Sequence, residues 1–198
     1  LVGDWSSDVC SSDLADMPGV VRILTADDIP GERVLGLYAK DWPVYIKVGE
    51  VTRYIGDALA CVVAETEAEA RAAAACVKVD YEVLTPLLDM EEAETSPIQI
   101  HENGNILLDK TIRRGEPVDD ALARCAFTAE ATYRTQAVEH AFIEPEAALA
   151  VPEAGGVRLY VQSQGIWHDK TDIAALLHVP TPKVTVTLAD SGGAFGGK

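Results

Sequence analysis

The segment 183–198, KVTVTLADSGGAFGGK, constrains the fold more than any other part of the sequence. Its first half alternates around β-branched residues, which predicts a strand. Its second half holds four glycines in the six residues from Gly192 to Gly197. Because glycine has no Cβ, it adopts positive φ and lets a ligand approach the backbone. A strand that leads into such a loop predicts a ligand site. The abrupt end after Lys198 leads us to expect a piece of a longer protein.

Composition excludes some classes of protein. With 198 residues, 48% hydrophobic and 24% charged, the chain has the material for one or two domains with a core. A net charge of −16 argues against a nucleic-acid binder, because phosphate contacts need Lys and Arg. No apolar run reaches the length that a membrane-spanning helix requires. Cys61 and Cys76 lie in apolar stretches and are predicted as core residues of a reduced, cytoplasmic protein.

The first residues differ from the rest of the chain. Ser-Ser-Asp occurs at both 6–8 and 11–13, and the stretch has no hydrophobic period. It also lacks the charged start and apolar centre of a signal peptide. Residues 4–14 resemble a translated sequencing adapter. We therefore predict that 1–14 is a non-native, disordered tail.

Residues 15–90 are predicted to form a compact unit of helices and strands. The pattern indicates strands at 20–24, 58–64 and 77–83, a helical turn at 25–28 and a helix at 68–76. Thr66 and Glu69 have the spacing of a capping box at the start of that helix. Prolines, an acidic run and turn residues indicate a linker over 91–117.

Residues 118–198 are predicted to form a second unit. The sequence indicates a short helix at 118–125, a long strand at 127–136 and a hairpin of strands at 147–151 and 157–162. The hairpin turn falls at 153–156. Apolar residues at helical spacing from Ile166 onward predict a helix that ends before Pro180. The final strand and the glycine loop follow.

Two features before the glycine loop could carry chemistry. The carboxylates of 139–146 flank His140, and such a group could perform acid–base catalysis or form an exposed corner of a strand. The stretch 162–165 lies between a strand and a helix. It could present side-chain amides to a ligand beside the helix N-terminus, or Ser163 could simply cap the helix.

The glycine loop also fits a nucleotide-binding pattern. Residues 192–198 read G-x-x-x-x-G-K, the start of a P-loop, although the Ser or Thr that completes it would follow Lys198. Phe195 would be unusual in a phosphate cradle, and the preceding strands have a mostly antiparallel character. A P-loop nucleotide-binding protein therefore remains an alternative, as does a non-catalytic α+β binding module.

From Met17 to Lys198 the chain resembles the molybdenum-cofactor-binding large subunit of the xanthine dehydrogenase and aldehyde oxidase family. MPGVVRILTADDIPG is similar to the opening strand and turn of that subunit, and residues 48–93 look like the core of its α/β hammerhead domain. IHENGNIL and RRGEPVDDAL resemble its linker. VEHAFIEPEAALA, YVQSQGIWHDK and GGAFGGK resemble its first cofactor-binding segment, and the order of these motifs carries the resemblance.

The resemblance implies an α+β fold: an α/β hammerhead domain followed by the start of a mixed-sheet cofactor-binding domain over 118–198. It implies a molybdenum–molybdopterin cofactor, in the cytosine dinucleotide form. It also implies hydroxylation of a purine, another N-heterocycle or an aldehyde, with water as the oxygen source. Electrons would pass to partners that carry 2Fe–2S clusters and, in some members, FAD, and the full-length protein would be an oligomer.

The resemblance also assigns site residues. Gln164 matches the family's metal-site glutamine, whose amide orients the metal centre. Gly193, Ala194, Phe195 and Gly196 match the family's cofactor-binding glycine loop. Gln164 and Phe195 would lie next to the molybdenum without coordinating it. The family's catalytic glutamate has no counterpart before the end of the sequence, so we expect the isolated chain to be inactive.

Overall fold

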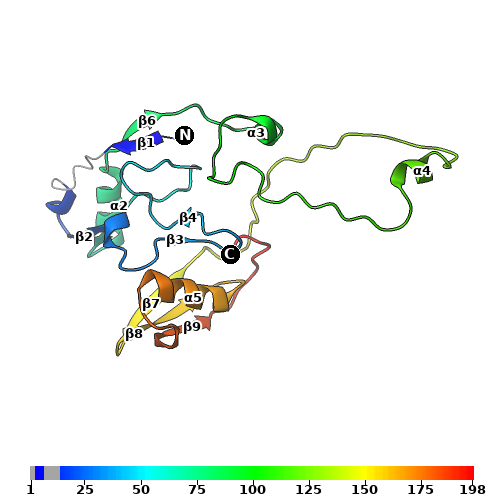
Figure 1. Cartoon of the computed structure of the whole chain (residues 1–198). Coiled ribbons are helices and arrows are strands. Elements are labelled where there is room, and N and C mark those ends of the chain that lie inside the picture. The colour runs from blue at the N-terminus through cyan, green and yellow to red at the C-terminus, as the bar shows by residue number, and fades with distance from the viewer. Residues whose placement is uncertain (1–2, 7–13) are drawn as a thin grey trace.

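The computed structural model describes residues 3–6 and 14–198 (Figure 1). Its first part holds β1 (Gly3–Ser6), β2 (Val20–Leu24), η1 (Ala26–Asp28), β3 (Val34–Leu35), β4 (Trp42–Pro43), β5 (Cys61–Ala64), α2 (Glu67–Ala75), β6 (Asp80–Val83) and α3 (Met90–Thr95). Its second part holds α4 (Val118–Leu122), β7 (Ala148–Glu153), β8 (Gly156–Val161), α5 (Ile166–Leu176), η2 (Thr181–Lys183) and β9 (Val184–Leu188). A long loop carries α4 away from the other elements of both parts (Figure 1).

The first part is the α/β unit that the sequence predicts. Antiparallel pairs join β2 to β5, β1 to β6 and β3 to β4, and α2 packs against β5 and β2. Thr66 is the N-cap of α2, since its hydroxyl oxygen accepts a hydrogen bond from the backbone N–H of Glu69 at 3.3 Å. Satisfying that N–H is what favours a helix start at this point. The predicted cap of this helix is therefore confirmed.

The prediction of a disordered tail over 1–14 is wrong where the structure describes it. Gly3–Ser6 forms β1 and pairs with β6, because the backbone edge of β6 offers a ladder of hydrogen-bonding groups. Leu14 is buried, as its apolar side chain favours. Residues 1–2 and 7–13 lie outside the described part of the chain, so the prediction is not addressed there.

The prediction of core positions for Cys61 and Cys76 is also wrong. Cys61, Cys76 and Cys125 are free and exposed, whereas Cys10 falls outside the described residues. The strand predicted at 58–64 is only four residues long, and exposed and half-buried residues alternate along it. The two-stranded β2–β5 sheet has α2 on one face, so alternate side chains of β5 point away from that cover. Cys76 is the C-cap residue of α2, at the end of the helix.

The second part contains both antiparallel and parallel strand pairs. β7 and β8 form the predicted hairpin, while β8 and β9 run parallel and are connected through α5. Leu159, Ala174 and Val184 are the buried centre of this unit. A parallel pair needs a crossover connection, which α5 supplies. The described strand pairs are mostly antiparallel, as inferred from the sequence, whereas β8–β9 is parallel, so the carboxyl ends of these two strands lie at one edge of the sheet.

The long strand predicted at 127–136 does not form. No strand of the described residues lies beside this stretch, and Phe127 and Tyr133 are 94% and 88% exposed. Alternating side chains favour an extended backbone, but a strand also needs a neighbour to accept its hydrogen bonds. The accessible surface is 15159 Å², whereas a compact monomer of this mass has about 9,000 Å². Much apolar surface is thus left uncovered.

Among the described residues, no helix has both the length and the apolarity needed to cross a bilayer.

Candidate cofactor-binding site

Two loops meet at the carboxyl edge of the parallel strands. One follows β8 and contains Gln164, and the other follows β9 and contains the glycines. The backbone N–H of Gly196 donates a hydrogen bond to Oε1 of Gln164 at 2.9 Å. With its oxygen engaged in this bond, the Gln164 amide keeps its NH₂ group as a donor. Two predicted site residues, 32 positions apart, are therefore joined directly.

The glycine loop has an unusual backbone. Gly193, Phe195 and Gly196 all have positive φ, at 151°, 53° and 92°. For Phe195, a left-handed conformation costs about 1–2 kcal/mol. The N–H of Gly197 donates to the carbonyl of Ala194 at 2.8 Å, which closes a turn. The Phe195 ring is 73% exposed, so main-chain atoms and one aromatic ring make up this wall of the site.

Glu144 connects the two ends of the glycine loop. Its Oε1 accepts a hydrogen bond from the N–H of Gly192 at 2.9 Å and lies 3.4 Å from the hydroxyl of Ser191. The same oxygen pairs with the ammonium group of Lys198, whose side chain is only 1% exposed. That ammonium group also lies 4.1 Å from the centre of the Phe142 ring. One carboxylate oxygen therefore ties the first and last residues of the loop.

These contacts settle how Glu144 behaves as an acid. The hydrogen bond from Lys198, followed by backbone N–H groups including that of Gly192, lowers the pKa of Glu144 to about 2. A carboxylate with such a pKa is ionised at neutral pH and is a weak general base. Glu144 is therefore neither a catalytic acid or base nor part of an exposed corner, because its side chain is 21% exposed and binds the loop. The side chain of Glu139, in contrast, is 79% exposed.

The residues of 140–144 lie under the loop, and their closeness explains two of its glycines. A Cβ at Gly192 would lie 2.4 Å from Oε2 of Glu144, and a Cβ at Gly197 would lie 2.8 Å from Nδ1 of His140. Both contacts are with side-chain atoms, so a larger residue at either position would displace Glu144 or His140. Sequence reasoning missed this relationship. The spacing of His140, Phe142 and Glu144 gave no usable signal, because the segment is not extended: Ala141 has a φ of 51° and residues 143–144 form a bend.

Ser163 does not cap α5, contrary to one interpretation of the stretch 162–165. Gly165 is the N-cap of α5 and makes no side-chain capping bond, while the hydroxyl of Ser163 accepts from the N–H of Gly165 at 2.9 Å. Ser163 thus shapes the turn before α5. Gln164 is exposed, and its side chain reaches the glycine loop. This outcome favours the interpretation in which the loop presents an amide.

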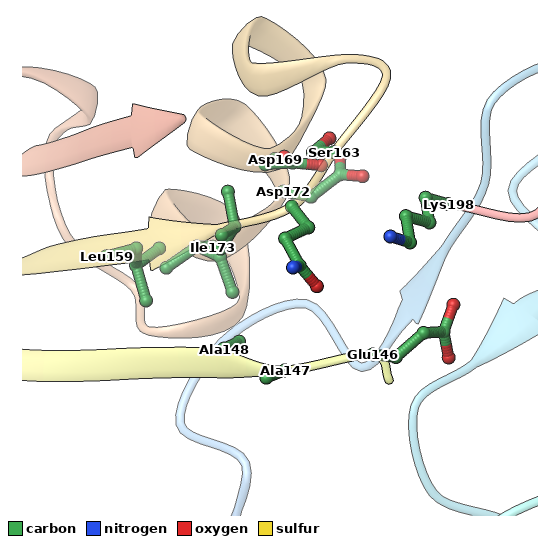
Figure 2. Close-up of a pocket in the computed structure, with 11 residues that line it drawn as sticks. Glu146, Ala147, Ala148, Leu159, Ser163, Asp169, Asp172, Ile173 and Lys198 are labelled. Carbon is green, nitrogen blue, oxygen red and sulfur yellow. The ribbon is translucent and has the colours of Figure 1, made fainter. Parts of the chain in front are cut away.

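A cleft of about 530 Å³ adjoins these loops (Figure 2). Ala147, Ala148, Leu159 and Ile173 form its apolar side, whereas Glu146 and Lys198 lie together at one end (Figure 2). Its remaining lining residues are Val161, Gln162, Ser163, Asp169 and Asp172. Within the described ranges, no group of three His, Cys, Asp or Glu side chains could hold a metal ion.

Comparison with known proteins defines the class. A family model described as "Molybdopterin cofactor-binding domain" matches residues 100–198. A second, described as "Aldehyde oxidase and xanthine dehydrogenase, a/b hammerhead domain", matches residues 7–85. The chain belongs to the xanthine dehydrogenase and aldehyde oxidase family of molybdenum hydroxylases. This family membership replaces the interpretation of the glycine loop as a P-loop. The pairing of Lys198 with the carboxylate of Glu144 agrees with that outcome.

Relatives of known name support the same class. The chain is 34% identical over 192 residues to a protein of Bacillus subtilis that is named as a probable xanthine dehydrogenase subunit, and covers 25% of it. It is 36% identical over 183 residues to the nicotinate dehydrogenase large molybdopterin subunit of Eubacterium barkeri, and covers 42% of it. These alignments take in 96% and 91% of this chain. The chain thus spans less than half the length of both relatives.

A solved structure shows the same fold. The aldehyde oxidoreductase from Desulfovibrio gigas superposes with a TM-score of 0.87 at 26% identity, over 98% of this chain and 22% of that one. The hammerhead domain and the start of the cofactor-binding domain that the sequence predicts are thereby confirmed.

Proposed function

We propose that this chain supplies one wall of the molybdenum site in an enzyme that hydroxylates a purine or another N-heterocycle, with water as the oxygen source. The observation that carries the proposal is the bond between the Gly196 N–H and Oε1 of Gln164. It joins the two loops that the family resemblance assigns to the cofactor. It also leaves the amide NH₂ group of Gln164 as a donor for a ligand.

The residues present fit a molybdenum–molybdopterin group. The loop 193–196 offers main-chain atoms with little side-chain cover, because Gly193, Ala194 and Gly196 carry at most one methyl group. We assign Gln164, Gly193, Ala194, Phe195 and Gly196 to cofactor binding. Gln164 and Phe195 would lie beside the metal without coordinating it.

The chain's own groups then have separate roles. When bound, the cofactor supplies the two-electron redox chemistry and the activated oxygen. The amide NH₂ of Gln164 would donate a hydrogen bond to the bound group and orient it. Backbone N–H groups of the loop are pre-organised donors, since their positions are set before the ligand arrives. The ring of Phe195, which is exposed, would shield the bound group from water.

Several further properties of the whole protein belong to this proposal. The two bacterial relatives are named as subunits, which supports partner subunits here. We propose that these carry 2Fe–2S clusters and FAD, that the cofactor is the cytosine dinucleotide form, and that the assembly is a cytoplasmic oligomer. An aldehyde substrate is a second candidate, favoured by the likeness to the aldehyde oxidoreductase. The isolated chain, without the rest of the site, would not turn over.

The test uses the full-length protein, co-expressed with its neighbouring subunits. Purified protein is assayed for molybdenum and for oxidation of hypoxanthine, nicotinate and benzaldehyde, in water enriched in ¹⁸O. We expect molybdenum to co-purify and ¹⁸O to enter a heterocyclic product. Labelled benzoate alone would favour the aldehyde alternative. Protein that carries no molybdenum, or product that carries no label, would contradict the proposal.

A further inference from the structure

We propose that Glu144 is a positioning residue, which closes the glycine loop into a fixed ring and thereby sets the backbone donors that face the cofactor. The proposal rests on the proposed function for the identity of the bound group. It assigns a role to Glu144 within the carboxylate motif of 139–146, which neither acid–base catalysis nor an exposed corner explains for this residue.

The first support is the geometry of the clamp. Ser191 and Gly192 at one end of the loop, and Lys198 at the other, all contact the same oxygen of Glu144. A glycine-rich loop has many accessible backbone conformations and few side chains that could pack to restrict them. Charged hydrogen bonds to both ends are therefore the main restraint available to it.

The second support is burial. The side chain of Lys198 is 1% exposed and lies over the Phe142 ring, so its ammonium group has lost most of its water. A buried cation needs a carboxylate and further hydrogen bonds to be stable. Glu144 supplies that carboxylate, and it lies two residues after Phe142 in the sequence. The pair is therefore held within the protein and is not a solvated surface contact.

The third support is the route from Glu144 to the site. Glu144 has no hydrogen bond to Gln164 among the described residues, and it acts through the loop. Once both ends are held, the turn from Ala194 to Gly197 places the Gly196 N–H 2.9 Å from Oε1 of Gln164. A loop released at Gly192 would lose this alignment, and the Gln164 amide would be free to rotate.

The test compares four variants of the full-length protein. Glu144→Ala removes the acceptor and the charge, Glu144→Gln keeps an acceptor for the Gly192 N–H, and Lys198→Met removes only the cation. Glu130→Ala changes an exposed glutamate of the preceding extended stretch and is the matched control. Hydrogen–deuterium exchange of peptides that cover 189–198 is measured in cofactor-free protein. Molybdenum content and the Mo(V) electron paramagnetic resonance signal are measured in protein loaded with cofactor.

We expect exchange in the loop to rise by about tenfold or more in Glu144→Ala, because charge-assisted hydrogen bonds at both ends are lost. Glu144→Gln should restore part of that protection, and Lys198→Met should be intermediate. Molybdenum content should fall, and the Mo(V) signal should broaden, in the same order. Glu130→Ala should match the unmodified protein in every measurement.

Loop exchange in Glu144→Ala equal to that of the unmodified protein would overturn the proposal. So would faster exchange accompanied by unchanged molybdenum content and an unchanged Mo(V) signal. If Glu144→Ala fails to fold, Glu144→Gln and Lys198→Met carry the same comparison. An unmodified protein without molybdenum would instead contradict the proposed function, while the exchange data would still report on the clamp.

Discussion

The backbone N–H of Glu32 donates a hydrogen bond to the carbonyl oxygen of Ala175 at 3.0 Å. Glu32 lies between η1 and β3 of the hammerhead part, whereas Ala175 lies in the last turn of α5. The carbonyl groups at the end of a helix have no partner within the helix. The Ala175 carbonyl also accepts from the N–H of His178 at 3.2 Å, so the first part of the chain adds a further donor to this helix end and helps to set the position of α5.

Replacement of Gly31 by alanine tests this contact. An added Cβ would lie 2.0 Å from the carbonyl oxygen of Ala175 and 2.9 Å from the N–H nitrogen of His178. Because both neighbours are backbone atoms, they cannot rotate away. We expect Gly31→Ala to lower the free energy of unfolding by about 1–3 kcal/mol, as overpacking does. Urea denaturation followed by circular dichroism measures the change.

Glu32→Ala is the control for Gly31→Ala. It keeps the backbone N–H and removes only the exposed ion pair with Lys40, at 2.5 Å. Its effect should stay below about 1 kcal/mol. Equal stability of the two variants would show that the contact with α5 does not need a glycine.

Two variants at Gln164 distinguish the role of its oxygen, which accepts the bond from Gly196, from the role of its NH₂ donor. The carboxylate introduced by Gln164→Glu still accepts a bond from Gly196 but has no NH₂ donor, whereas Gln164→Leu has neither group. We expect turnover by the full-length enzyme to fall by about 10–100-fold in both variants, as loss of an orienting partner beside a metal does. Hydrogen exchange of the glycine loop should rise only in Gln164→Leu. Turnover that survives in Gln164→Glu would mean that the amide donor is not needed.

The lowered pKa of Glu144 predicts a dependence of stability on pH. The pKa falls from 4.5 to about 2 in the folded protein, chiefly through the hydrogen bond from Lys198. The stabilisation is thus fully present above 4.5 and is lost progressively as the pH falls towards 2. The stability difference between the unmodified protein and Glu144→Gln should shrink between about pH 6 and about pH 3. Urea titrations at each pH measure it, and a constant difference would contradict the assignment.

The N-cap of α2 gives a local stability prediction. Thr66→Ala removes the acceptor for the N–H of Glu69, and such losses cost about 1 kcal/mol. The melting temperature should fall accordingly, as measured by differential scanning calorimetry. Thr66→Ser keeps a hydroxyl and should melt close to the unmodified protein. A similar loss in both variants would indicate that the methyl group of Thr66, and not its hydroxyl, stabilises the helix.

Elements with a strong local signal could be predicted from the sequence. Val20–Leu24, the helix after Thr66 and the hairpin turn at 153–156 were placed closely, because strand pattern, capping and turn residues act over a few positions. The prediction of a strand at 127–136 was wrong because strand formation does not depend on local residues alone. The alternation in this stretch is real, but pairing depends on a neighbour that lies elsewhere. The exposure of Cys61 likewise depends on which face of a small sheet α2 covers.

By itself, the sequence determined the pieces of the site: a strand that leads into a glycine loop, and Gln164 between a strand and a helix. Only the tertiary structure decided that β8 and β9 run parallel, which brings Gln164 to Gly196. It also decided that Glu144, 48 residues before Gly192, holds the loop closed. Local conformation follows from neighbouring residues, whereas strand partners and charge pairs distant in sequence are selected by hydrogen bonding and burial across the whole fold.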